Sequence, residues 1–197
     1  MEIIPLIKLN KRKIIDEDES SSDNIFEQID EEQLLYILDL DGIEKDKPNL
    51  CTYQKLSKSY ELWIDNGPRN LGDVVDAFMA GATRITIRKD LCLQLDIPSI
   101  REITENKIYI NINLEDQKTH VSEDMFYHEI DGLVNFNDRE KIRLDFRYSE
   151  FLKRFSIKNK IYSYESDPLN VSYWKNYGVE GLLVEIKKLQ EFKKYAL

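Results

Sequence analysis

Residues 60–89 read YELWIDNGPRNLGDVVDAFMAGATRITIRK, and this stretch decides the fold. Aromatic and apolar residues at 60–64 predict a buried strand, and apolar positions at helical spacing within 71–80 predict a helix. The β-branched run at 83–87 predicts a second strand. A strand, a helix and a strand in this order form a βαβ unit, which requires a parallel sheet and a right-handed crossover. If the unit recurs, the fold is α/β.

Residues with defined backbone roles mark the boundaries of this unit. Asp65-Asn66-Gly67-Pro68 has the composition of a turn, because glycine permits positive φ and proline fixes φ at a bend. Asn70 is suited to cap the helix N-terminus, and Gly81 is suited to end the helix. Gly178 stands about half the chain further on and is also followed by an apolar strand. This repeat predicts a barrel built from two related halves.

The same alternation of strands and helices runs along the whole chain. We expect strands at 2–9, 34–40, 60–64, 83–87, 107–113, 132–137, 160–164 and 181–185. We expect helices at 25–32, 49–57, 71–80, 97–105, 122–130, 148–155, 170–177 and 187–196. Eight such units predict one compact (β/α)8 barrel domain over residues 1–197, with an open doubly wound sheet as the alternative. Because 197 residues are fewer than the roughly 250 typical of this barrel, several helices must be short or missing.

Composition and charge limit the classes of partner. The net charge of −9 argues against nucleic acid as the main partner. No apolar run approaches the length of about 18 residues that a membrane span needs. Cys51 and Cys92 stand far apart without a CxxC pattern, so we expect reduced thiols in a cytoplasmic protein, with a monomer as the default. The acidic, serine-rich stretch 15–30 predicts a solvated loop that is a candidate for flexibility.

Polar residues fall late in the predicted strands, where a (β/α)8 barrel carries its active site. Because side chains alternate along a strand, residues of one parity line the interior. On each strand we predict that the inward-facing set of alternate residues is the set that ends in a polar residue. These residues are Lys8, Asp39, Asp41, Asp65, Arg88, Asn111, Asn113, Asn135, Asn137, Glu165 and Glu185. The pattern favours a functional pocket at the barrel mouth, with plain solvent-facing strand ends as the alternative.

The charges near the predicted mouth indicate two kinds of chemistry. Basic side chains bind phosphate or carboxylate groups, and the candidates for anion binding are Arg88, Lys89 and Arg69. Carboxylates act as acids or bases when burial raises their pKa, and an amine is a nucleophile when its pKa falls. The catalytic candidates are accordingly Asp39, Asp41, Asp65 and Lys8. The expected pocket-lining residues are Asn111, Asn113, Asn135, Glu165 and Glu185.

Two other interpretations of these charges stay open. The same residues can form a purely structural network of salt bridges. The three aspartates at 39, 41 and 65 can also bind Mg²⁺, which prefers oxygen ligands. No GxGxxG, Walker or GxSxG motif occurs in the chain. We therefore expect no bound cofactor and no resident metal, and a small anionic metabolite as the ligand.

Four segments are similar to the phosphoribosyl isomerase of histidine biosynthesis, ProFAR isomerase. They are MEIIPLIKL (1–9), LLYILDLDGIE (34–44), WIDNGPRNLGDVVDAFMAGATRITI (63–87) and NYGVEGLLVEIKKL (176–189). They resemble that family's first strand (IIPAIDL), its second-strand motif (VDLDGA), its region GGGIRSLEDVEALLAAGADRVIIGT, and its last strand and helix. The resemblance covers the chain in order and is weak between 114 and 160. It implies a (β/α)8 barrel made of two half-barrels.

The departures from the family are as informative as the matches. The family's catalytic aspartate on the first strand corresponds to Lys8, and its second one corresponds to Asn111 or Asn113. Glycines of both phosphate loops are replaced, for example by Glu185 on the last strand. The resemblance therefore implies a divergent paralogue that does not catalyse the histidine-pathway isomerisation. Similar proteins without the aspartates occur in methanogenic archaea, which points to one-carbon coenzyme biosynthesis as an isomerase or lyase of small phosphorylated metabolites. A non-catalytic barrel that binds a metabolite or a protein is the alternative.

Overall fold

The computed structural model describes residues 1–15, 25–92, 97–112 and 129–196. The strands are β1 (Glu2–Asn10), β2 (Lys13–Ile15), β3 (Leu34–Asp39), β4 (Glu61–Asp65), β5 (Ala82–Arg88), β6 (Lys107–Ile112), β7 (Gly132–Asn135), β8 (Lys160–Tyr164) and β9 (Gly181–Glu185). The α-helices are α1 (Leu40–Lys45), α2 (Leu50–Leu56), α3 (Leu71–Met79), α4 (Ile97–Arg101), α5 (Arg139–Leu144), α6 (Phe146–Ser156), α7 (Val171–Asn176) and α8 (Leu189–Ala196). Three short 3₁₀ helices complete the description: η1 (Ile25–Gln28), η2 (Pro168–Asn170) and η3 (Ile186–Lys188).

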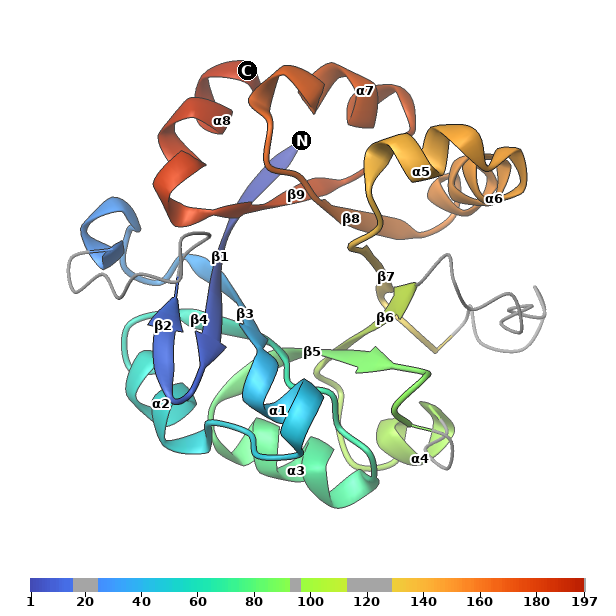
Figure 1. Ribbon diagram of the computed structural model, residues 1–197. Helices are drawn as coiled ribbons and strands as arrows, with labels where there is room; N and C mark the ends of the chain where they lie inside the picture. Colours follow the sequence, from blue (N-terminus) through green and yellow to red (C-terminus); the bar gives the residue numbers. More distant parts are fainter. Residues whose placement is uncertain (16–24, 93–96, 113–128, 197) are drawn as a thin grey trace.

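The strands form a closed barrel, and Figure 1 looks down the barrel axis. The order is β1-β3-β4-β5-β6-β7-β8-β9, every neighbouring pair is parallel, and β9 pairs with β1 to close the ring of eight strands. Following the register once around the ring displaces the chain by about eight residues along β1, which is the stagger of a (β/α)8 barrel. The barrel prediction is confirmed, and the open doubly wound alternative is wrong because β9 bonds to β1.

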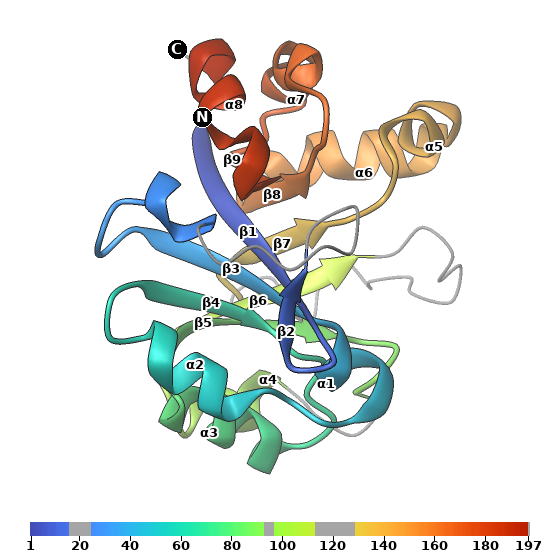
Figure 2. The same ribbon diagram turned by 60° about the vertical axis from the view of Figure 1, so that its left-hand side comes forward.

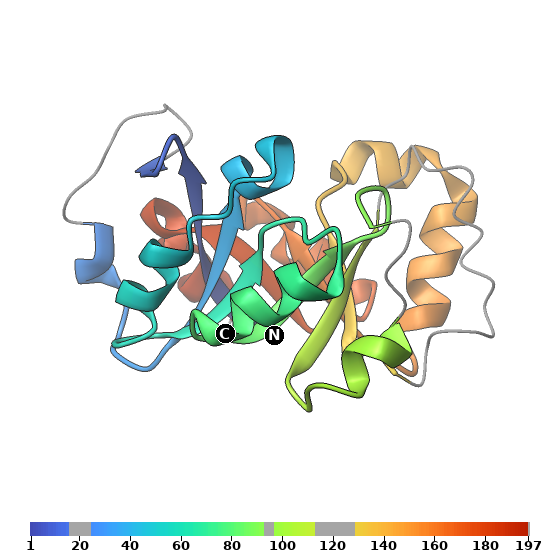
Figure 3. The same cartoon turned by 90° about the horizontal axis from the view of Figure 1, so that it is seen from below.

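The helices cover the outside of the barrel in two groups (Figures 1 and 2). One group, α2 to α4, lies along β3 to β6, and Figure 3 shows it from below. The other, α5 to α8, lies over β7 to β9 and the start of β1. The two chain ends lie close together beside α8. Within the described ranges, none of the helices is long and apolar enough to span a membrane.

The buried apolar side chains form two separate layers. The outer layer lies between the strands and the helices and includes Ile7, Ile64 and Ile85. The inner layer fills the barrel and is dominated by large rings: Tyr36, Trp63, Tyr109 and Tyr162. The rings of Trp63 and Tyr109 are 4.0 Å apart between centroids, and those of Trp63 and Tyr162 are 4.9 Å apart. The interior is therefore packed solid below the mouth, as is usual in this fold.

The predicted turn and cap residues act as expected. Asn70 and Asp73 form a capping box at the start of α3, each side chain accepting from the other's backbone amide at 3.2 Å. Gly81 has φ of +104°, and a Cβ at this position would lie 2.4 Å from the Cβ of Ser57. Only glycine fits there. Gly178 also has positive φ, +70°, where α7 gives way to β9. The descent from two half-barrels stays a prediction.

Three elements were not predicted from the sequence: β2, α1 and α5. The strand expected at 34–40 ends at Asp39, because Asp39 caps α1 by accepting from two backbone amides. Residues 139–156 hold two helices, because Asp138 caps α5 and Asp145 caps α6. The expected strand at 132–137 ends at Asn135. The expected helix at 122–130 lies largely outside the described residues, as does most of the acidic loop.

Candidate functional site

The predicted set of inward-facing residues is confirmed on five strands, and on the other three strands the opposite set faces inward. On β1, β4, β5, β6 and β9 the predicted parity faces the interior, as the inner-layer residues Leu6, Trp63, Tyr109 and Leu183 show. On β3, β7 and β8 the interior instead receives the other parity. There the inner layer contains Tyr36, Leu38, Val134, Phe136, Tyr162 and Tyr164. The polar residues at the ends of those three strands therefore lie outside the interior.

The first group at the mouth is an ion pair between β4 and β5. The guanidinium of Arg88 donates to both oxygens of Asp65, from Nε at 2.8 Å and from Nη2 at 2.7 Å. The phenol of Tyr36 donates to the same carboxylate at 2.9 Å and lies 3.2 Å from Thr86 Oγ1. Trp63 Nε1 also donates to Thr86, at 2.9 Å. Asp65 is thus held by a bidentate pair at the boundary of the packed interior.

The Asp65 carboxylate favours the protonated forms of its two neighbours, Arg88 and Tyr36. Burial by itself lowers the pKa of the Arg88 guanidinium, but the adjacent Asp65 carboxylate outweighs burial and raises that pKa above its usual value. Burial, and then the charge of Asp65, raises the pKa of the Tyr36 phenol well above its usual range. Tyr36 therefore stays protonated at physiological pH and can only donate to Asp65.

The second group lies across the mouth, on β1, β8 and β9. Lys8 Nζ forms a close ion pair with Glu185 Oε1, and the phenol of Tyr164 donates to the same oxygen at 3.0 Å. The ammonium of Lys8 also stands 5.6 Å from the centroid of the Tyr164 ring. An amine, a carboxylate and a phenol are therefore gathered in one cluster.

Two aromatic rings connect the groups along one side of the mouth. Phe136 and Tyr164 are stacked, with centroids 5.7 Å apart and planes 22° apart. Arg88 Cζ lies 5.8 Å from the Phe136 centroid, so each ring carries a cation beside it. Sequence reasoning missed both rings because it assigned the wrong parity to β7 and β8. Alternation places Val134 with Phe136, and Tyr162 with Tyr164, on one face of each strand, but it does not show that this face is the interior one.

In both ion pairs the cation is the more exposed partner. The side chain of Lys8 is 22% exposed and that of Glu185 is 9% exposed. The side chain of Arg88 is 17% exposed, whereas that of Asp65 is fully buried. The carboxylates therefore lie against the packed interior, and the positive ends of the pairs face the opening.

Asp39, a predicted catalytic residue, lies on the helix-facing side of β3 and is fully buried. Its carboxylate accepts hydrogen bonds from the backbone amides of Asp41 (3.1 Å), Gly42 (3.3 Å) and Asn49 (2.7 Å). Asn49 Nδ2 (2.8 Å) and the phenol of Tyr53 also donate to it. Burial and the charge of Asp39 raise the pKa of Tyr53. This network joins β3, α1 and α2, so the geometry gives Asp39 a structural position.

Asp41 lies near the mouth but is bound to the β1–β2 hairpin. Its carboxylate accepts from Lys45 Nζ at 2.7 Å, from the Arg12 amide at 3.0 Å and from Asn49 Nδ2 at 3.2 Å. Lys11 and Arg12 both have positive φ, 51° and 63°, which costs energy for non-glycine residues. Burial by itself raises the pKa of Asp41, but these hydrogen bonds outweigh it and hold the pKa well below its usual range. Asp41 therefore stabilises the turn of the hairpin.

Asn135 and Asn137, predicted to line the interior, lie on the helix-facing side of the barrel instead. Asn135 Nδ2 donates to Ser163 Oγ at 2.7 Å, and its Oδ1 accepts from the Tyr148 phenol at 2.9 Å. Asn137 Nδ2 donates to Asn135 Oδ1 at 2.8 Å and to the Ile112 carbonyl at 2.9 Å. These bonds attach α6 to the ends of β6 and β7 and do not face the opening.

Glu165 also lies outside the interior, on the side of α7. One carboxylate oxygen accepts from Trp174 Nε1 at 2.9 Å. The other accepts from the backbone amides of Ser166 at 2.8 Å and Asp167 at 2.9 Å. Glu165 therefore shapes the loop after β8 and anchors α7 to it.

Arg69, predicted to bind an anion, clamps two loops. Its Nη1 donates to the carbonyls of Gly42 (3.1 Å) and Gly67 (2.9 Å) and to Asp46 Oδ1 (3.0 Å). Its Nη2 donates to the Ile43 carbonyl at 2.9 Å. The guanidinium is thus occupied by the end of α1 and the turn after β4. These contacts favour a structural role over anion binding.

The remaining predicted site residues lie in three different positions. Asn111 is on the interior parity of β6, with Nδ2 3.5 Å from the Val134 carbonyl. Lys89 follows β5 in the next turn, is half-buried, and has its pKa lowered by that burial. Asn113 lies outside the described residues. Cys51 is exposed, Cys92 is buried, and neither is in a disulfide.

The predicted magnesium alternative is not supported. Asp39, Asp41 and Asp65 do not converge, and no three His, Cys, Asp or Glu side chains in the described ranges form a group able to hold a metal ion. No protein-family model and no curated protein matches the chain. The fold and the geometry of the mouth therefore carry the functional argument.

Proposed function

We propose that the barrel mouth binds a small metabolite in which an anionic group, phosphate or carboxylate, adjoins a flat ring. The observation that supports this proposal is the orientation of the two ion pairs, whose carboxylates are buried and whose cations face the opening. Each cation keeps donor capacity beyond its partner. Asp65 accepts two of the five N–H groups that a guanidinium carries, and Glu185 accepts one of the three on an ammonium.

The aromatic rings at the mouth provide a surface for the flat ring of the proposed ligand. Phe136 and Tyr164 present stacked rings between the two cations. A planar group of a ligand can stack on these rings while its anionic group lies near Lys8 or Arg88. Because the interior below is filled by aromatic side chains, the ligand is small or only partly enclosed.

A second candidate function is catalysis on that bound metabolite, as an isomerase or lyase. The cluster of Lys8, Glu185 and Tyr164 favours it, because an amine, a carboxylate and a phenol can relay a proton when they are within hydrogen-bonding reach. Descent from the ProFAR isomerase lineage, with a present role in one-carbon coenzyme biosynthesis, is part of this proposal and rests on the sequence resemblance. Lys8 at the position of the family's first aspartate, and Asn111 or Asn113 at that of the second, argue for a changed reaction.

A thermal-shift screen followed by calorimetry tests the binding proposal. The panel contains phosphorylated sugars, phosphorylated heterocycles such as pterins, and the dephosphorylated form of each compound. We expect a stabilising shift with compounds that carry both an anion and a ring, and a smaller shift with their neutral counterparts.

Variants locate the site and separate binding from general charge effects. Lys8→Gln is expected to weaken binding about tenfold, whereas Lys160→Gln, at the opposite end of β8, is the charge-matched control and leaves it unchanged. Equal affinity of the two variants would place the anion elsewhere. If a bound compound is converted over time by the wild type but not by Glu185→Gln, the enzyme candidate is supported. Binding without conversion supports the non-catalytic barrel.

A further inference from the structure

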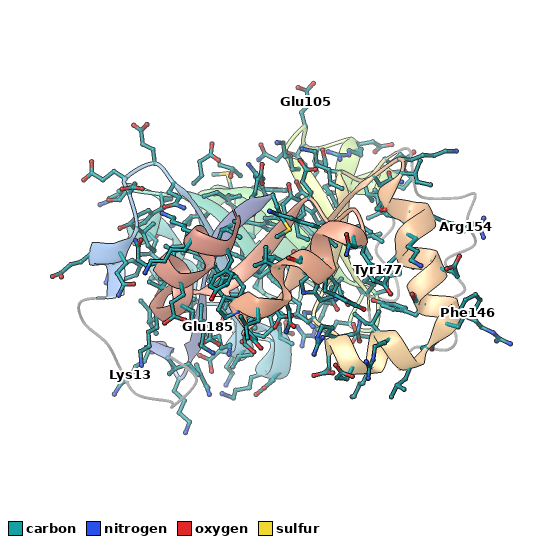
Figure 4. All side chains as sticks on the ribbon, turned by 90° about the horizontal axis from the view of Figure 1, so that it is seen from above. Lys13, Glu105, Phe146, Arg154, Tyr177 and Glu185 are labelled. Atoms are coloured by element: carbon teal, nitrogen blue, oxygen red, sulfur yellow. The ribbon has the colours of Figure 1, made fainter. Side chains whose placement is uncertain are left out.

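The corner between α5 and α6 exposes large apolar side chains that are not among the residues assigned to the mouth. Leu144, the last residue of α5, is 82% exposed, and Phe146, the first residue of α6, is 75% exposed. Figure 4 shows Phe146 at the outer edge of the molecule, at the end of α6 that adjoins α5. Ile157, at the other end of α6, is 80% exposed. Neighbouring apolar side chains this exposed mark an interaction surface.

The charge of this helix pair is opposite to that of the whole chain. Residues 139–156, which span the two helices, contain six Lys and Arg and three Asp and Glu, whereas the whole chain has a net charge of −9. Arg143 and Arg139 both pair with Glu140, which lies on the same helix. The segment is thus a basic island on an acidic protein, and it attracts a partner of the opposite sign.

The corner also forms an open notch with a defined lining. A cavity of about 660 Å³ is lined by Lys141, Leu144, Asp145, Phe146 and Arg147. The backbone of the corner is held in place, because the Asp145 carboxylate accepts from the amides of Arg147 at 3.0 Å and Tyr148 at 3.1 Å. The Asp145 amide donates to the carbonyls of Lys141 at 3.1 Å and Ile142 at 3.2 Å. The apolar walls and the basic side chains are therefore presented on a rigid support.

We propose that this notch docks an acidic segment of another protein, with a large apolar side chain between Leu144 and Phe146 and carboxylates beside Lys141 and Arg147. Apolar anchors combined with Arg and surrounded by polar residues are typical of protein interfaces. An anionic membrane fits the corner less well, because insertion would desolvate the carboxylates of Asp145 and Glu140. A symmetric pairing of two copies through this corner fits less well too, since it would bring the basic side chains of both copies together.

Selection from a displayed random-peptide library against the full chain tests the proposal. We expect enriched peptides that combine Asp or Glu with aromatic or large aliphatic residues. Their affinity, measured by fluorescence polarisation, is expected to fall at least about tenfold in Leu144→Ser/Phe146→Ser and in Lys141→Glu/Arg147→Glu. All four side chains line the rim of an open notch, so both variants are expected to fold, which circular dichroism checks. Lys194→Glu on α8 is the control and leaves affinity unchanged.

Three outcomes would overturn the proposal. The first is a selection whose peptides show no acidic bias or bind the Leu144→Ser/Phe146→Ser variant as well as the wild type. The second is binding to vesicles containing phosphatidylserine that the same variant abolishes, which would assign the corner to membranes. The third is a dimer in analytical ultracentrifugation that this variant dissociates, which would assign it to self-association. None of these results bears on the barrel mouth, so the metabolite-binding proposal is tested separately.

Discussion

Replacing Arg88 with Met provides a quantitative test of the ion pair at the mouth. The substitution keeps most of the apolar volume but leaves Asp65, which is fully buried, with the Tyr36 phenol as a donor. Removing one partner of a buried pair typically costs about 3–5 kcal/mol. We expect a loss of about 3–4 kcal/mol in the free energy of unfolding at pH 7, in the lower part of that range, because the Tyr36 phenol still donates to the Asp65 carboxylate.

A double variant makes this expectation specific. Asp65→Asn/Arg88→Met removes both charges and is expected to recover about half of the loss.

Urea unfolding followed by tryptophan fluorescence measures these effects, because Trp63 donates to Thr86 within the same network. The single variant Asp65→Asn is expected to cost less than Arg88→Met. The reason is that Arg88, at 17% exposure, can still reach solvent, whereas Asp65 cannot. A loss below about 1 kcal/mol for Arg88→Met, or a double variant that recovers none of the loss, would refute the reasoning.

Three further expectations concern the structural residues. Tyr53→Phe removes a buried hydroxyl donor to a carboxylate and should cost about 1–3 kcal/mol in urea unfolding, whereas Tyr195→Phe, at an exposed position, should cost less than about 0.5 kcal/mol. Asp41→Asn should cost about 1–2 kcal/mol at pH 7. Because the folded pKa of Asp41 is depressed, the wild type keeps this advantage in full above about pH 4 and loses it progressively as pH falls from there towards the folded pKa, so the difference in stability should be smaller at pH 3 than at pH 7. Gly132→Ala places a Cβ 2.3 Å from the Lys160 carbonyl oxygen and should lower Tm by at least about 5 °C in calorimetry.

The polar residues near the strand ends belong to two groups: some face the barrel mouth, and others hold the surrounding helices and loops. Polar residues at strand ends first indicated a ring of side chains, but among those within the described ranges only Lys8, Asp65, Arg88, Asn111 and Glu185 are on the inward-facing side of their strands. The others hold helices and loops around the rim, as Asp39 does for α1 and α2. Both groups are polar because both lie near the end of the barrel that meets loops. Their residue types alone therefore do not distinguish a ligand site from its supports.

Local sequence signals determined the order of the elements. The β-branched run of β5, the Asn70 cap and the glycine at 81 each carry their structural preference within a few residues, so they could be interpreted without the rest of the chain. Eight such units also favoured a closed ring, with an open doubly wound sheet as the alternative, because a parallel sheet of alternating strands and helices has few ways to bury all its strands. The length indicated that the helices would be short.

Tertiary structure alone decided which face of β3, β7 and β8 points inward. Strands of a parallel barrel are apolar on both faces, so alternation does not show which set lies inside. The predicted alternation was also extended beyond the ends of two strands. β3 ends at Asp39 and β7 ends at Asn135, and the backbone turns after these residues. The pairing of Lys8 with Glu185 joins residues from opposite ends of the chain, and it exists only because β9 closes against β1. Contacts of that range depend on barrel closure, which no local pattern encodes.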